Sequence, residues 1–144
     1  MAKVVASTSS TVAAAPERVL ETLRDYQSAR AGILTDNYSA YRVQQGGAGE
    51  GTVFSYHFAA GGRERDYRLR VSESPGTIRE ADELSSFVTI WTVAAAAEGS
   101  VVTLESSWNG AGGIGGLFEG LFAPIGLRRI QAQVLARLAA AIGG

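Results

Sequence analysis

The spacing of apolar residues changes several times along the chain, and each change predicts a different element. Val4–Val12 alternates loosely and is rich in β-branched residues, which predicts a strand. Apolar residues then fall on one face of a short helix from Pro16 to about Arg24, since the first helical turn tolerates a proline. A second short helix is expected from about Tyr26 to Leu34.

From Tyr38 onward, apolar and polar residues alternate with a period of two. The alternating segments are separated by turn signals such as Gly46–Gly49 and Pro75-Gly76. Successive strands joined by tight turns describe an antiparallel meander. Strands are expected over Tyr38–Val43, Thr52–Phe58, Asp66–Val71, Thr77–Glu83, Phe87–Val93 and Val101–Trp108.

The C-terminal part combines a glycine-rich hinge, Asn109–Gly116, with a helical stretch from about Leu117 to Ile142. Apolar residues before and after Pro124 fall on nearly opposite sides of a straight helix of about 100° per residue. Because proline removes a helix hydrogen bond, we predict two helical pieces, or one bent helix, with different buried faces. No repeat or interdomain linker interrupts this order, so residues 1–144 are expected to form a single α+β domain.

Composition and charge limit the classes of binding partner that the chain is expected to have. A chain of 144 residues that is 46% hydrophobic and 19% charged is globular and large enough for one core with some room inside. The net charge of −1 gives no overall attraction to nucleic acid, so no nucleic acid partner is expected. No apolar run reaches the roughly 20 residues of a membrane span, and the N-terminus has no secretory apolar segment. We therefore expect no stable membrane insertion and a cytoplasmic location.

Residue counts and short motifs exclude several chemistries. The chain has no cysteine, which removes disulfides, thiol catalysis, zinc–thiolate sites and iron–sulfur clusters. His57 is the only histidine, so a histidine-rich metal site is excluded. The glycine cluster lacks the Gly-Lys-Ser/Thr ending of a phosphate-binding loop, and no Gly-x-Ser-x-Gly elbow is present. Neither a metal nor a cofactor is expected.

The order of these elements resembles that of a known protein family over nearly the whole chain. The resemblance rests on five segments, Val12–Val19, Gly49–Val53, Phe87–Val93, Leu104–Trp108 and Gly113–Leu138. In this order they resemble the START/Bet v1-like superfamily, also called SRPBCC or helix-grip proteins, and within it the bacterial polyketide cyclase/dehydrase and lipid-transport group. The resemblance implies a curved seven-stranded antiparallel sheet around a long C-terminal helix, two short helices after the first strand, and an internal cavity.

One position departs from the family pattern. Ala15 stands where a serine or aspartate usually caps the first helix. The start of that helix is therefore expected to be weaker by about 0.5–2 kcal/mol.

Aromatic residues on alternating strand positions are the candidate ligand-binding set. If the face that carries them points inward, they converge under the terminal helix and line an apolar pocket, although ordinary core packing is the alternative for each residue. The polar tips of Tyr56, Tyr67 and Trp108 would then orient a ligand. The set comprises Phe54, Tyr56, Phe58, Tyr67, Phe87, Trp91, Trp108, Phe118 and Phe122.

Three charged or titratable residues are candidates for chemistry. Arg65 shares a strand face with Tyr67 and is expected at the cavity rim, where it could bind a ligand carboxylate or phenolate. His57 alternates away from Tyr56 and is expected on the solvated face. Glu105 alternates away from Trp108, and only a β-bulge would bury it as a general acid or base.

Three functions stay open at this level. The first is binding or transport of a small hydrophobic or aromatic ligand, lipid or polyketide-like, in the cavity. The second is a polyketide cyclase or dehydratase in the same cavity, with Tyr56, Tyr67 and Arg65 as its polar groups. The third is a protein-interaction module, as a homodimer or with another protein, that uses the apolar stretch Leu117–Ile125.

Overall fold

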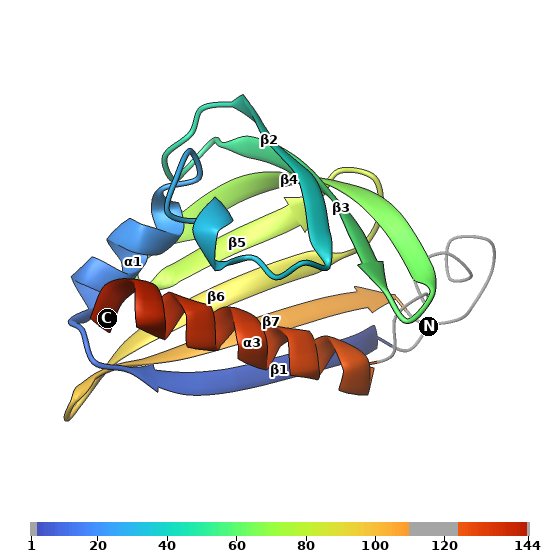
Figure 1. The fold of residues 1–144 in the computed structure, drawn as a ribbon. Coiled ribbons are helices and arrows are strands. Elements are labelled where there is room, and N and C mark those ends of the chain that lie inside the picture. The colour runs from blue at the N-terminus through green and yellow to red at the C-terminus, as the bar shows by residue number, and fades with distance from the viewer. Residues whose placement is uncertain (1–2, 110–123, 144) are drawn as a thin grey trace.

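The computed structural model describes residues 3–109 and 124–143 and has one antiparallel sheet that curves around a long helix (Figure 1). The sheet order is β1-β7-β6-β5-β4-β3-β2, so only β1 and β7 pair without being consecutive strands. This seven-stranded α+β arrangement confirms the expected fold. The elements are β1 (Lys3–Val12), α1 (Pro16–Arg24), the 3-10 turn η1 (Ala31–Ile33), β2 (Tyr38–Gln45), β3 (Val53–Ala60), β4 (Arg63–Ser74), β5 (Thr77–Asp82), β6 (Val88–Ala96), β7 (Gly99–Asn109) and α3 (Pro124–Gly143).

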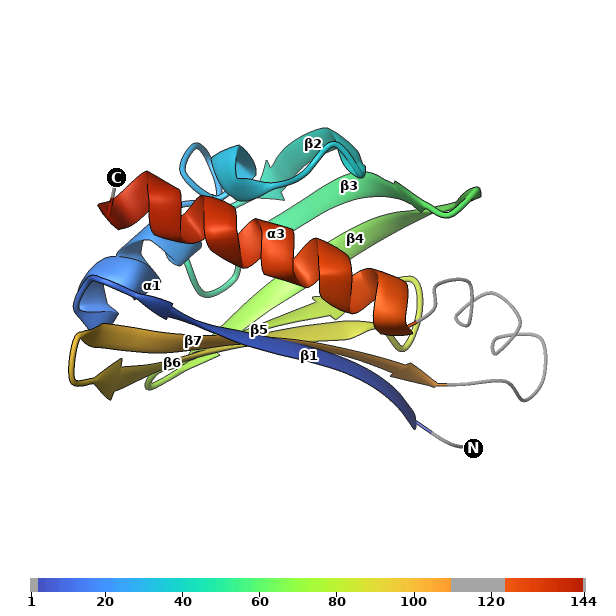
Figure 2. The ribbon, with the colours of Figure 1, turned by 60° about the horizontal axis from the view of Figure 1, so that its bottom comes forward.

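Helix α3 lies across the concave face of the sheet, as Figure 2 shows, and α1 closes one end. The buried side of α3 includes Leu127, Ile130, Val134 and Leu138, the face that the apolar spacing predicted. Pro124 occupies the first turn of α3, where its missing N–H costs no hydrogen bond. The hinge over 110–116 and the expected helical piece before Pro124 lie outside the described residues. Among the described residues, no helix is long and apolar enough to span a membrane.

The second predicted helix is wrong in extent. Between Tyr26 and Leu34 only Ala31–Ile33 is helical, as a short 3-10 turn. The Asp25 carboxylate accepts hydrogen bonds from the backbone N–H of Ser28 and of Ala29, at 3.2 and 3.3 Å. These local bonds stabilise a turn in competition with a helix. Helix α1, by contrast, begins at Pro16 as expected, and Ala15 makes no side-chain cap.

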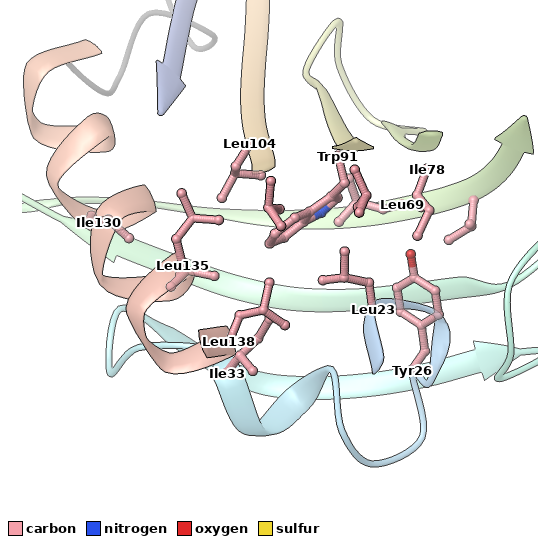
Figure 3. Packing of buried hydrophobic residues seen from close by; sticks show 14 of the residues in the cluster. Leu23, Tyr26, Ile33, Leu69, Ile78, Trp91, Leu104, Ile130, Leu135 and Leu138 are labelled. Atoms are coloured by element: carbon pink, nitrogen blue, oxygen red, sulfur yellow. The ribbon is translucent and has the colours of Figure 1, made fainter. Parts of the chain in front are cut away.

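The core lies between the concave face of the sheet and α3. Side chains of the sheet, such as Leu69, meet Leu23 of α1, Ile33 of η1, and Leu135 and Leu138 of α3 there (Figure 3). Each is at most 1% exposed. Burial of one such side chain contributes about 1.5–3 kcal/mol, so these contacts hold α1, η1 and α3 on the sheet.

Candidate ligand-binding cavity

A partly enclosed cavity lies between the concave face of the sheet and the first half of α3. Its atom-free space is about 680 Å³ with the open mouth included, but the centres of water molecules can occupy only about 40 Å³ of it. The cavity is therefore a narrow slot that holds a few waters. Its described lining is Arg30, Leu34, Tyr38, Phe54, Tyr56, Phe58, Tyr67, Glu80, Phe87, Thr89, Trp91, Leu104, Ser106, Trp108, Leu127, Gln131 and Val134.

Aromatic rings form one continuous series along the cavity wall. The strand register explains it, because Tyr56 of β3 lies directly opposite Tyr67 of β4, and alternate residues share one face. Neighbouring ring centroids are 4.8–6.1 Å apart, within the range of favourable tilted and offset contacts. In order of contact, the series runs Trp108, Phe87, Tyr67, Tyr56, Phe54 and Tyr26.

A buried ion pair joins the far end of this series. Nη2 of Arg30 donates to Oε1 of Glu80 at 2.9 Å, and the two side chains are only 5% and 4% exposed. The Arg30 guanidinium also lies over three aromatic rings, of which Trp91 is nearest at 4.8 Å from the ring centroid. Such an aromatic enclosure stabilises a desolvated cation.

Both oxygens of the Glu80 carboxylate accept hydrogen bonds. Its Oε2 accepts the Tyr26 hydroxyl at 2.5 Å, and its Oε1 accepts the Trp91 indole N–H at 3.3 Å as well as Arg30. Burial opposes the charge on Arg30, but the adjacent Glu80 carboxylate raises the pKa of the guanidinium above its usual value. Burial, with the Glu80 charge, likewise raises the pKa of Tyr26. Arg30 therefore stays charged and Tyr26 keeps its proton.

Local structure places both members of the pair. Arg30 stands at the end of the turn that Asp25 organises, and its backbone N–H donates to the Asp25 carbonyl at 2.9 Å. Glu80 lies on β5 opposite Val71 of β4 and Thr89 of β6, two residues of the inward face. The chain thus brings together two charges that are 50 residues apart in the sequence.

The remaining polar lining consists of hydroxyls, an amide and an indole. Burial raises the pKa of Tyr38 to about 12, and burial with the nearby Tyr38 and Tyr67 hydroxyls raises that of Tyr56 well above its usual value. These phenols are neutral donors at physiological pH. Thr89 and Ser106 share a hydrogen bond of 2.8 Å.

Gln131 fastens α3 to β1. Its amide donates to the Ala6 carbonyl at 3.0 Å and accepts the Thr8 hydroxyl at 2.9 Å. The polar atoms of this side chain are therefore committed to holding the helix on the sheet.

Three donor nitrogens of the described wall are unpaired. Nε and Nη1 of Arg30 and Nε1 of Trp108 are buried and have no hydrogen-bond partner within the described part of the chain. Buried donors without a partner are uncommon in folded proteins. Within residues 3–109 and 124–143, no cluster of three or more His, Asp or Glu side chains could hold a metal.

Seven of the residues predicted from the sequence line this cavity, namely Phe54, Tyr56, Phe58, Tyr67, Phe87, Trp91 and Trp108. Phe118 and Phe122 lie outside the described residues. Arg65 is not in the described lining, because it stands close to the β3–β4 turn, with its guanidinium 5.6 Å from the centroid of the Tyr67 ring.

His57 and Glu105 do not line the cavity either. His57 lies on the other face of β3, where Nδ1 is 2.6 Å from Asp66 and Nε2 is 2.8 Å from Glu64. Glu105 is paired with Ser7 and Ile90 and alternates with the inward Leu104 and Ser106, so no bulge turns it inward.

The sequence reasoning missed Arg30 and Glu80. One signal was available for Glu80, since it alternates with Ile78, an apolar residue of the inward face. Arg30 had none, because it lies in a segment that was predicted as a helix and forms a turn.

The sequence matches the family model described as polyketide cyclase/dehydrase and lipid transport over residues 1–143. The solution structure of the KanY protein is 43% identical, with a TM-score of 0.90 and full coverage of both chains. Two more distant structures share the fold. Ginseng major latex-like protein 151 from Panax ginseng is 13% identical (TM-score 0.71, 97% of each chain). The di-domain ARO/CYC BexL is 14% identical (TM-score 0.71), and the match covers 99% of this chain and 50% of BexL. None of the curated proteins matches the sequence significantly.

Proposed function

The chain belongs to the polyketide cyclase/dehydrase and lipid transport family, and on that premise we propose that it binds a small hydrophobic ligand, lipid or polyketide-like, in the cavity under α3. The observation that carries the proposal is the series of lining rings from Trp108 to Phe54, because ring faces form an apolar wall for a ligand. Burial of about 300 Å² of apolar ligand surface would contribute about 7 kcal/mol before ordering costs.

The wall supports binding better than catalysis. Glu80 is the only carboxylate in the described lining, and its oxygens already accept bonds from Arg30, Tyr26 and Trp91. A carboxylate held in this way is a poor general base. The cyclase or dehydratase alternative would depend on hydroxyls such as Tyr56, whose raised pKa keeps it protonated, so that it can donate a hydrogen bond but is neither a base nor a ready acid near neutral pH.

Entry of a ligand requires side chains to move. The slot admits only a few waters in the present arrangement, so rings on the sheet and residues of α3 must separate to hold a larger molecule. Rearrangement of side chains at a binding surface is common and needs little backbone movement.

A cavity-filling variant tests the proposal. Thr89→Phe places a ring in the cavity, whereas Thr92→Phe makes the same change on the outer, exposed side of β6. Native mass spectrometry of freshly purified protein, with calorimetric titration of 2-acetylnaphthalene, should show a bound apolar molecule in the wild type and in Thr92→Phe. Thr89→Phe should bind at least about tenfold more weakly. Equal affinity in the folded Thr89→Phe protein would rule out the cavity as the binding site.

A further inference from the structure

Charge is balanced on the cavity wall. Among the described lining residues, only Arg30 and Glu80 carry a full charge, and they are bound to each other at 2.9 Å. Both are almost completely shielded from water, so the field of one is offset by the other at close range. An ionised ligand would therefore find no free counter-charge on this wall.

The unpaired groups of the wall can only donate hydrogen bonds. Nε and Nη1 of Arg30 lie at one end of the ring series, and Nε1 of Trp108 belongs to the ring at the other end. Guanidinium and indole N–H groups have no acceptor capacity. A ligand oxygen that reached them would satisfy donors that have no partner among residues 3–109 and 124–143.

We propose that the cavity selects uncharged ring compounds that carry carbonyl or ether oxygens, and discriminates against carboxylates of the same size and shape. This inference rests on the proposed function, since it names the class of ligand for that same cavity. It separates two classes that are equally apolar over most of their surface, neutral ketones and ethers on one side and acids on the other.

The physical reason is the cost of desolvation. A carboxylate that enters the slot loses its hydration and meets Glu80, whose charge already neutralises Arg30. A ketone loses much less hydration, and its oxygen accepts from an N–H group to which the described residues offer no acceptor. A hydrocarbon avoids the desolvation cost but leaves these donors unpaired.

Three matched probes test the inference on the wild-type protein. They are 2-acetylnaphthalene, which is neutral with one acceptor oxygen, 2-naphthoate, which is ionised at neutral pH, and 2-ethylnaphthalene, which has no oxygen. Calorimetry at neutral pH should rank the ketone first, with naphthoate at least about tenfold weaker. The chain has two tryptophans, so the indole N–H signal of Trp108 can be followed by NMR and should shift most with the ketone.

Two variants identify the groups responsible. Glu80→Gln leaves the Arg30 charge uncompensated. It should reduce or reverse the preference for the ketone over naphthoate. Trp108→Phe removes one donor while it keeps an aromatic ring. It should bring the affinity for the ketone closer to the affinity for 2-ethylnaphthalene. If Glu80→Gln does not fold, the wild-type ranking and Trp108→Phe still decide the question. Glu105→Gln removes a carboxylate outside the cavity lining and serves as the control.

The outcomes separate this inference from the proposed function. Binding of naphthoate as tight as binding of the ketone would overturn the selectivity and leave the binding function standing. An unchanged preference in Glu80→Gln would show that charge balance is not its cause, and would overturn it too. Failure of all three probes to bind would overturn both proposals.

Discussion

Loss of Arg30 alone should destabilise the protein far more than loss of both charges of the buried pair. Arg30→Met leaves the Glu80 carboxylate 4% exposed, with Tyr26 and Trp91 as its remaining donors. Removal of one partner from a buried pair typically costs 3–5 kcal/mol, and solvent screening is negligible at this depth. The lost contacts between the guanidinium and three rings add to this cost.

The double variant Arg30→Met, Glu80→Gln removes the charge while it keeps an acceptor for the Tyr26 hydroxyl. Its free energy of unfolding should lie above that of Arg30→Met by about 2 kcal/mol or more, because no buried charge is left without a partner. Urea denaturation of the wild type, both single variants and the double variant completes the cycle. A loss below about 1 kcal/mol in Arg30→Met, or a double variant no more stable than it, would refute this account of the pair.

Two further predictions concern regions away from the cavity. Ala15→Ser should raise the free energy of unfolding by about 0.5–2 kcal/mol, because Ala15 caps α1 with extended backbone angles but makes no side-chain hydrogen bond. Thermal unfolding measures the change, and the same substitution at the exposed Ala13, outside α1, is the control. No gain in Ala15→Ser would count against the cap. The pKa of His57 should lie above 6.5, because the hydrogen bond to Asp66 favours the charged ring. Desolvation opposes this effect, and the hydrogen bond to Glu64 adds to it. In Asp66→Asn, NMR titration should show a lower pKa of His57. The contribution of this cluster to stability is present at low pH and is lost as pH rises through the raised pKa, and an unchanged titration in Asp66→Asn would contradict the assignment.

The sequence predicted the parts of the fold that depend on local spacing. Alternation along β3 placed Phe54, Tyr56 and Phe58 on one face and His57 on the other, as the structure has them. The apolar spacing of α3 likewise identified its buried side. Both succeed because a period of two or of 3.6 decides which side of an element is apolar.

The errors arose where a tertiary or capping interaction decides the structure. Alternation placed Arg65 on the face of Tyr67, where its guanidinium lies 5.6 Å from that ring's centroid, but the face does not tell how far along the strand the lining extends, so a role for Arg65 at the rim stays a prediction. The Tyr26–Leu34 segment contains good helix formers, and a single carboxylate, Asp25, diverts it into a turn. The partner of Glu80 could not be inferred for the same reason, because that turn carries Arg30 to the sheet.

Stability alone does not account for the Arg30–Glu80 pair. A buried ion pair replaced by well-packed apolar residues of similar volume often leaves a protein equally or more stable, since desolvation of two charges offsets much of their attraction. Aromatic rings surround the pair, with Phe54 and Trp91 against the guanidinium. On our proposal the pair acts on what the cavity can bind, because it supplies N–H donors without a net charge. An apolar replacement would leave Nε1 of Trp108 as the one donor of the described wall without a described partner, so a neutral ketone should lose part of its advantage over a hydrocarbon.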